Sequence, residues 1–181
     1  MTAFPGKPVL PKDATPAPPS TLIIFGGSGD LTKRLVMPSL YNLAKDGALD
    51  DRFRIVGVDI VEHTEEDYRA FLTETAKELA SAGNADVDAD AWNWLMERTG
   101  YVIGDFESDA TYDAVKERIA ANEPESHGAV FYFAVAPRFF GAIADHLAKA
   151  GLMEESESEF RRIVVEKPFG MDLPSARALN A

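Results

Sequence analysis

Short apolar runs alternate with longer amphipathic segments along most of the chain. The runs have strand length and are rich in β-branched and aromatic residues; they span residues 21–25, 53–59, 101–103, 129–136 and 162–166. The segments between them carry helical signals, over residues 30–46, 64–82, 88–98, 112–121 and 138–150, with a last helix beginning near Asp172. Strands that alternate with helices predict an α/β fold, a doubly wound parallel sheet of Rossmann-like type. That fold has six strands in the order 3-2-1-4-5-6, and since five are predicted here, we expect a sheet one edge strand short.

Single residues inside these segments predict where the helices begin, bend and end. Pro38 lies within the first helical segment and should kink it or split it in two, because proline lacks the N–H of a helical hydrogen bond. Gly47 and Gly151 follow helical segments, where a glycine in the left-handed conformation commonly ends a helix. Thr64 with Asp67 three residues later predicts a helix start of the capping-box type, with Asp in place of the usual Glu.

Residues 1–20 differ from the rest of the chain in composition. They hold six of the chain's 11 prolines and lack the continuous apolar segment of a signal peptide. We expect a flexible Pro-rich tail over residues 1–20, with a docking peptide as the alternative, and one folded domain over residues 21–181.

The formal net charge is −12, from 18 basic and 30 acidic side chains. Such a surface repels nucleic-acid backbones and anionic membranes, so we expect neither as a partner, and an anionic cofactor would need local donors. No apolar run reaches the roughly 18 residues of a membrane span. The absence of cysteine excludes disulfides and thiolate metal sites, and we expect a cytoplasmic protein without a metal.

The candidate chemistry begins at the turn between the first strand and the first helix, which reads Gly26-Gly27-Ser28-Gly29-Asp30-Leu31. Glycine allows the positive φ of a tight turn and lets a pyrophosphate approach the backbone. The helix N-terminus that follows offers unpaired N–H groups and a partial positive charge. The G-x-G-x-x-G fingerprint would have its last glycine at Thr32, so the match is incomplete, but its place after the first strand favours a dinucleotide site.

Other interpretations of this region exist. The turn could be a plain strand–helix connection with Asp30 as the N-cap. A P-loop requires Lys followed by Ser or Thr directly after its last glycine, and the order Thr32-Lys33-Arg34 excludes it. Tyr41 and Lys45 match the Tyr-x-x-x-Lys pair of short-chain dehydrogenases, but the apolar periodicity of the first helix explains their spacing better.

Three segments resemble glucose-6-phosphate dehydrogenase in sequence and in order: residues 25–34 (FGGSGDLTKR), 135–141 (VAPRFFG) and 165–170 (VEKPFG). The resemblance covers residues 21–181, and the Glu-Lys-Pro-x-Gly segment is its most specific part. It implies the coenzyme-binding portion of an enzyme of the pentose phosphate pathway. That enzyme oxidises glucose 6-phosphate at C1 to 6-phosphogluconolactone and passes a hydride to NADP⁺ or NAD⁺.

The resemblance also implies a set of site residues. Lys167 would contact both the sugar phosphate and the cofactor, and Pro168 would follow a cis peptide bond. The residues that would line the cofactor are Gly26, Gly27, Ser28, Gly29, Asp30, Leu31, Thr32, Lys33, Asp105, Phe106 and Tyr132. Independently of the resemblance, Lys167 lies at the carboxyl end of a predicted parallel strand, where doubly wound folds bind ligands and an ammonium pairs with phosphate. The alternative is a surface lysine paired with Glu166, which is a poor pairing because neighbours on a strand point to opposite faces.

Two positions differ from the family's pattern. Leu35 stands where members often have a lysine, which removes one cation from the cleft. NADP-preferring members carry an arginine just past the second strand, and that position is Ile60, preceded by Asp59.

Asp59 bears on the choice of cofactor. An acidic residue at this strand end accepts hydrogen bonds from a free ribose 2′-OH and repels a 2′-phosphate. Asp59 lies 30 residues beyond Gly29 instead of the usual ~20, and a solvated loop aspartate is the alternative. We expect NAD⁺ to be accepted, alongside or instead of NADP⁺.

Removing the hydroxyl proton during hydride transfer requires a base, usually histidine. His63, His127 and His146 do not follow predicted buried strand ends and are expected to be surface residues. In the family, the base lies in an Asp-His-Tyr segment and a later histidine, which would fall beyond residue 181. The substrate domain and most contacts of the family's homo-oligomers would fall there too. We therefore expect no catalytic residue in this chain and no turnover by the chain alone.

Two other functions remain as alternatives. A non-catalytic module could use the same fold to sense NAD(P). A nucleotide-sugar or sugar-phosphate enzyme of different chemistry could also share the scaffold, because fold does not determine function. The Glu166-Lys167-Pro168 segment argues against the second of these.

Overall fold

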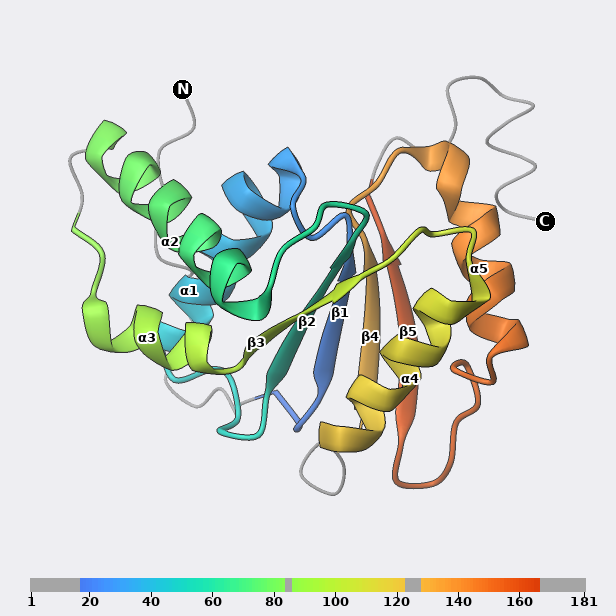
Figure 1. Ribbon diagram of the computed structural model, residues 1–181. Helices are drawn as coiled ribbons and strands as arrows, with labels where there is room; N and C mark the ends of the chain where they lie inside the picture. Colours follow the sequence, from blue (N-terminus) through green and yellow to red (C-terminus); the bar gives the residue numbers. More distant parts are fainter. Residues whose placement is uncertain (1–16, 84–85, 123–127, 167–181) are drawn as a thin grey trace.

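The computed structural model describes residues 17–83, 86–122 and 128–166. Within these residues, five parallel strands form one twisted sheet (Figure 1). The strands are β1 (Thr21–Phe25), β2 (Arg54–Asp59), β3 (Thr99–Ile103), β4 (Gly128–Phe133) and β5 (Phe160–Val165), in the spatial order β3-β2-β1-β4-β5. This order confirms the predicted doubly wound fold, with β1 at the centre and the chain crossing from one side of it to the other after β3.

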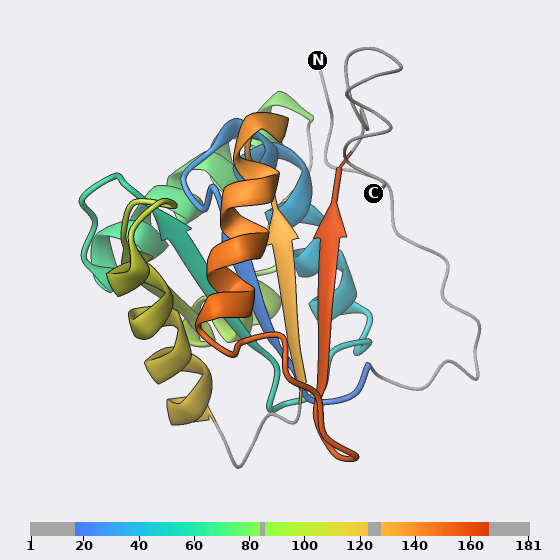
Figure 2. The same cartoon turned by 90° about the vertical axis from the view of Figure 1, so that its right-hand side faces the viewer.

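Helices cover both faces of the sheet. One face carries the π-helical turn η1 (Thr32–Val36), α1 (Met37–Lys45), α2 (Glu65–Ala82) and α3 (Ala89–Glu97). The opposite face, toward the viewer in Figure 2, carries α4 (Asp109–Asn122) and α5 (Phe140–Lys149), the latter entered through the 3₁₀ turn η2 (Pro137–Phe139). None of the helices in the described ranges is both long and apolar enough to cross a membrane.

The central strand β1 contributes to two separate hydrophobic cores. Leu22 and Ile24 pack toward α1, α2 and α3, whereas Ile23 and Phe25 pack toward α4 and α5. All five residues of β1 are buried, because successive side chains point to opposite covered faces. A strand in this position reads as one continuous apolar run, which is how the sequence identified it.

The local helix signals were interpreted correctly. The segment containing Pro38 is split, with the π-helical turn η1 ending where α1 begins and the proline in the first turn of α1. Gly47 has φ +68°, and the N–H groups of Gly47 and Ala48 donate to the carbonyls of Ala44 and Leu43, which is a Schellman motif. Thr64 and Asp67 form the predicted reciprocal capping box at the start of α2.

Several boundaries differ from those predicted. β3 begins at Thr99 instead of Tyr101, because Gly100 hid the start of the strand. β4 ends at Phe133 instead of Ala136, because the chain turns into η2 after the Ala134 N–H donates to the Phe25 carbonyl. α4 begins at Asp109, before the predicted start at Tyr112.

Four predictions fall on parts of the chain that lie outside the described residues. These are the last helix near Asp172, the contacts of Lys167, the peptide bond before Pro168 and the surface position of His127. Of the tail predicted over residues 1–20, only residues 17–20 are described. There the Ala17 N–H donates to the Ala48 carbonyl, and the Ser20 carbonyl accepts from the Arg54 N–H. The domain boundary at residue 20 stays a prediction.

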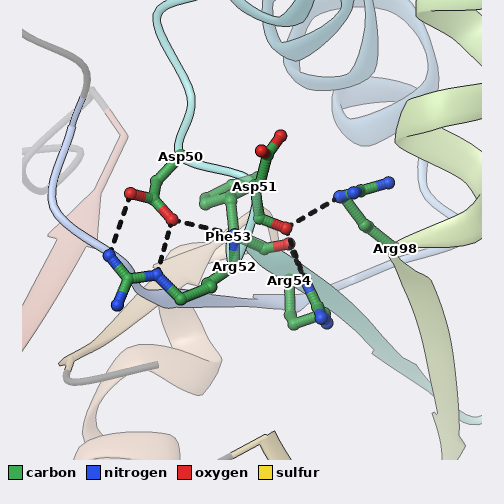
Figure 3. A network of polar contacts seen from close by, with 6 residues as sticks. All are labelled: Asp50, Asp51, Arg52, Phe53, Arg54 and Arg98. Carbon is green, nitrogen blue, oxygen red and sulfur yellow. Dashed lines mark hydrogen bonds and ion pairs between the residues drawn. The ribbon is translucent and has the colours of Figure 1, made fainter. Parts of the chain in front are cut away.

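A polar network holds the amino-terminal ends of β2 and β3 together (Figure 3). The carbonyl of Asp51 accepts hydrogen bonds from Arg54 at 3.0 Å and from Arg98 at 3.1 Å. Asp50 and Arg52 form an ion pair at 2.9 Å in the same loop. These arginine side chains hydrogen-bond the backbone of a loop at the amino-terminal ends of the strands, whereas the glycine turn lies at the carboxyl end of β1. We therefore assign the network a structural role.

Candidate functional site

The predicted glycine turn lies at the carboxyl end of β1, between the ends of β2 and β4. The N–H groups of Gly26 and Gly27 both donate to the Val58 carbonyl of β2, at 2.9 and 3.1 Å. Gly26 has φ +88°, and a Cβ there would lie 2.5 Å from the Ala134 carbonyl oxygen. A Cβ on Gly27 would lie 2.8 Å from the Cα of Gly57. Only glycine fits at these two positions, because the backbones of three strands converge on the turn.

Behind the turn, the start of the first helix presents backbone donors. The first helical hydrogen bond runs from the Lys33 N–H to the Gly29 carbonyl at 3.1 Å. The N–H groups of Asp30, Leu31 and Thr32 precede that bond and therefore have no acceptor within the helix. The Thr32 hydroxyl donates to the Gly26 carbonyl at 2.8 Å, which fixes the helix start against the turn. This arrangement fits a phosphate group, which needs several N–H donors and a positive helix end.

Charged side chains at the helix start partly neutralise one another. Asp30 is exposed and pairs with Lys33 at 3.2 Å and with Arg34 at 3.7 Å. The hydrogen bond and the charge of Lys33, with a smaller effect of Arg34, hold the pKa of Asp30 below its usual value. Lys33 also lies over the ring of Phe71 in α2, 5.2 Å from its centre. Any anion at this turn therefore meets two cations that already have a carboxylate partner.

Asp59, at the end of β2, is held against the glycine turn. Its carboxylate accepts a hydrogen bond from the Ser28 N–H at 3.0 Å and another from the Ile60 N–H at 2.8 Å. Ile60 is 65% exposed. The carboxylate is thus a fixed acceptor at the place where a doubly wound fold binds the ribose of a dinucleotide.

Two buried tyrosines that the sequence did not single out support the same turn. The Tyr68 hydroxyl donates to the Gly27 carbonyl at 2.9 Å. The hydroxyl fits there only because Gly57 has no side chain, since a Cβ on Gly57 would lie 2.5 Å from the Tyr68 hydroxyl oxygen. The Tyr101 hydroxyl donates to the Val61 carbonyl at 2.8 Å and lies 3.1 Å from the Ser28 Oγ. Both read as apolar members of a helix and a strand, so no sequence signal identified them.

The other predicted residues divide between two places. Asp105 and Phe106 follow β3, whose end is joined to β2 by the Gly104 N–H donating to the Asp59 carbonyl at 2.9 Å. Asp105 is exposed and its carboxylate accepts from the Glu107 N–H. The ring of Phe106 packs against Phe25 of β1, at 6.0 Å between ring centres, so it contributes to the core beneath the loop.

Tyr132 of β4 lies in a separate, largely apolar groove of about 330 Å³ on the other side of η1. Leu31 and Leu35 line the same groove, and Leu35 is 45% exposed there. The Tyr132 hydroxyl hydrogen-bonds to Glu166, and burial together with this carboxylate raises the pKa of Tyr132. Glu166 directly precedes Lys167, so the last described residue lies at this groove.

The two histidines in the described part of the chain are partly exposed, and both pack on aromatic rings. His63 stacks on Phe71 at 5.3 Å and meets the Tyr101 ring edge-on at 5.6 Å. His146 contacts Asp109 at 2.8 Å through Nδ1 and stacks on Tyr112. Among the described residues, no three side chains of the His, Cys, Asp or Glu type are grouped so that they could hold a metal ion.

Comparison with known proteins gives a consistent result. The family described as "Glucose-6-phosphate dehydrogenase, NAD binding domain" matches residues 23–181. The glucose-6-phosphate 1-dehydrogenase of Chlamydia pneumoniae is 31% identical over 170 residues, which are 90% of this chain and 32% of the relative. The enzyme of the same name from Leuconostoc mesenteroides is 35% identical over 159 residues, 86% of this chain and 31% of the relative.

Solved structures agree with these relatives. The crystal structure of glucose-6-phosphate 1-dehydrogenase from Mycobacterium avium superposes with a TM-score of 0.76 at 32% identity. The match covers 90% of this chain and 33% of that protein. A glucose-6-phosphate dehydrogenase in complex with its substrate glucose 6-phosphate gives the same TM-score at 30% identity. The chain thus spans about a third of the length of the relatives that it matches.

Proposed function

Because the chain belongs to the glucose-6-phosphate dehydrogenase family through its NAD-binding domain, we propose that it is the coenzyme-binding portion of a glucose-6-phosphate 1-dehydrogenase. That enzyme oxidises glucose 6-phosphate at C1 to 6-phosphogluconolactone, and the bound NAD⁺ or NADP⁺ would supply the hydride acceptor. The observation that carries the proposal is the glycine turn, where a Cβ on Gly26 or Gly27 would collide with backbone. The turn leads directly into a helix start with free N–H groups.

The pyrophosphate of the cofactor would bind at that helix start. The N–H groups of Asp30, Leu31 and Thr32 are its donors, and the helix dipole favours its negative charge. Lys33 and Arg34 add cations, although both already pair with Asp30. This local set of donors answers how a chain of net charge −12 attracts an anionic cofactor.

The adenosine ribose would bind at Asp59. The Asp59 carboxylate is held in place by the Ser28 and Ile60 N–H groups and retains lone pairs that can accept a hydrogen bond from a ribose 2′-OH. A 2′-phosphate would meet a carboxylate there, and the following residue is the apolar Ile60. We therefore propose that NAD⁺ is accepted, in addition to or in place of NADP⁺.

The remaining roles concern the nicotinamide end and the sugar phosphate. Tyr132 and Glu166 meet at the apolar groove, and Lys167 is the next residue along the chain. We assign Lys167 the contact with the phosphate of glucose 6-phosphate and with the cofactor, while Tyr132 lines the cofactor's path. Asp105 and Phe106, after β3, would line the adenosine side.

The 181-residue chain would bind the cofactor without oxidising the sugar phosphate. His63 stacks on Phe71, while His146 stacks on Tyr112 and hydrogen-bonds to Asp109. The two histidines lie on opposite faces of the sheet. Neither position suits a base that removes a proton from the C1 hydroxyl. A reducing compartment such as the cytoplasm suits the chain, since it has no cysteine.

The experiment that tests this function is a calorimetric titration of the purified chain with NAD⁺ and NADP⁺, after a cooperative unfolding transition has shown that it is folded. Binding of either dinucleotide, displaced by the other, is the expected result. A folded chain that binds neither would contradict the proposal. Assay of the same sample with glucose 6-phosphate should show no reduction of cofactor, and turnover by contaminant-free protein would contradict that part alone.

A further inference from the structure

The hydroxyl groups of Ser28 and Tyr101 meet beside the Asp59 carboxylate, and one arrangement of their protons makes both contacts of Tyr101 hydrogen bonds. A tyrosine hydroxyl has one proton to donate. Tyr101 donates it to the Val61 carbonyl at 2.8 Å. The 3.1 Å contact between the two hydroxyls can therefore form only if Ser28 donates and Tyr101 accepts.

Tyr101 is a neutral phenol near neutral pH, since an ordinary tyrosine has a pKa of about 10. Its side chain is only 4% exposed, and burial raises the pKa of Tyr101 above its usual value. The nearby charge of Asp59 adds to this effect, while the hydrogen bond from Ser28 opposes it. The donor to the Val61 carbonyl is thus a neutral phenol with a proton to donate.

In this arrangement Ser28 can only accept further hydrogen bonds. Its hydroxyl proton is committed to Tyr101, and its backbone N–H is committed to Asp59 at 3.0 Å. The Oγ of Ser28 and the carboxylate of Asp59 lie next to one another, each with lone pairs left and neither with a proton to offer a ligand. A ligand group at this point is stabilised if it donates hydrogen bonds, as a hydroxyl does, and is repelled if it offers only acceptors, as a phosphate does.

We propose that Tyr101 is a specificity-determining residue that makes the ribose end of the cofactor site select a 2′-hydroxyl over a 2′-phosphate, by holding the proton of Ser28. This inference rests on the proposed function, since it assumes that a dinucleotide binds at the glycine turn. The inference adds a second acceptor, the Oγ of Ser28, to the carboxylate of Asp59. Tyr101 of β3 makes Ser28 an acceptor by accepting its hydroxyl proton in a hydrogen bond. Tyr101 acts through Ser28 and is a positioning residue without direct contact to the cofactor.

The test is the Tyr101→Phe variant, which keeps the buried ring and removes the acceptor of the Ser28 proton. The freed hydroxyl can then donate to a 2′-phosphate. Calorimetric titration with NAD⁺ and NADP⁺ should show the ratio Kd(NADP⁺)/Kd(NAD⁺) falling about tenfold relative to wild type, the size expected for one hydrogen bond to a charged group. In a Ser28→Ala background, the same Tyr101→Phe change should leave the ratio where Ser28→Ala alone puts it.

The matched control is Tyr41→Phe. Tyr41 is another buried tyrosine, in α1 and away from the turn, and its hydroxyl accepts a hydrogen bond from the Asp88 N–H at 2.8 Å. This variant should leave the ratio at the wild-type value, and thermal unfolding confirms that each variant is folded. If Tyr101→Phe weakens the binding of both dinucleotides by the same factor, or leaves the Kd ratio unchanged, the inference is overturned while the proposed function stands. A shift that persists without Ser28 overturns it as well. Failure of folded wild-type chain to bind either dinucleotide overturns the proposed function and this inference together.

Discussion

The carboxylate of Asp59 accepts a hydrogen bond from the backbone N–H of Ser28 at 3.0 Å, although the two residues are 31 positions apart in the sequence. This bond joins the end of β2 to the middle of the glycine turn. It sets the acceptor that would contact the ribose at a fixed place relative to the N–H groups that would contact the pyrophosphate. This contact adds to the bonds from the Gly26 and Gly27 N–H groups to the Val58 carbonyl, which also join the turn to β2.

Removing the charge of Asp59 should change cofactor choice more than stability. Asp59→Asn keeps an oxygen acceptor for the Ser28 N–H, gives up the acceptor of the exposed Ile60 N–H, and no longer repels a 2′-phosphate. We expect Kd(NADP⁺)/Kd(NAD⁺) to fall about tenfold, which corresponds to about 1.4 kcal/mol. Asp59→Ala also removes the acceptor and should destabilise the fold by about 1–3 kcal/mol. Denaturant unfolding and calorimetric titration separate the two effects, and an unchanged preference in both variants would reject the role of Asp59.

Gly26→Ala should destabilise the domain by at least about 2 kcal/mol, because alanine is strained at φ +88° and its Cβ would lie 2.5 Å from the Ala134 oxygen. Gly141→Ala is the matched control. It lies in α5, and a Cβ there meets no atom within 4 Å, so the substitution should stabilise the helix by about 0.5–1 kcal/mol. Urea unfolding of both variants measures this. Similar effects of the two changes would show that the turn does not need glycine.

Asp30→Asn should strengthen binding of the dinucleotide several-fold. The change removes a negative charge from the helix start and releases Lys33 and Arg34 from their ion pairs with Asp30. The gain should shrink as salt is raised, since all three side chains can reach solvent. Asp113→Asn on α4 changes the net charge equally and should leave the affinity unchanged. Equal gains from both variants would point to net charge as the cause.

The loop between α1 and β2 should contribute a pH-dependent stability. Hydrogen bonds from Arg52 lower the pKa of Asp50 from 3.8 to about 2 (Figure 3). Because the pKa is lower in the folded state, this stabilisation is complete above the unfolded pKa and is lost as the pH falls toward 2. Arg52→Gln should therefore be less stable than wild type at pH 5, and the difference should shrink between pH 4 and pH 2. Thermal unfolding across this range measures it, and a constant difference would contradict the assignment.

Much of the fold could be predicted because its signals are local. β1 was recognised from five consecutive apolar or β-branched residues. The Schellman motif at Gly47 and the Thr64–Asp67 capping box depend on residues within about one helical turn. The glycine turn was found for the same reason. The start of β3 was missed because Gly100 weakens the strand pattern, and only pairing with β2 makes that residue part of the sheet.

What the sequence alone determined is therefore the order of strands and helices, the doubly wound fold and the turn that would receive a phosphate. Only the tertiary structure decided which side chains surround that turn. Parallel pairing sets Ile24 beside Gly57 and Gly57 beside Tyr101, and this register brings the Tyr101 hydroxyl to Ser28 across 73 residues. Tyr68 reaches Gly27 across 41 residues through the space above Gly57. Such contacts depend on the register of three strands and on the packing of a helix over them, whereas a residue's own neighbours in the sequence determine only whether it lies in a strand, a helix or a turn.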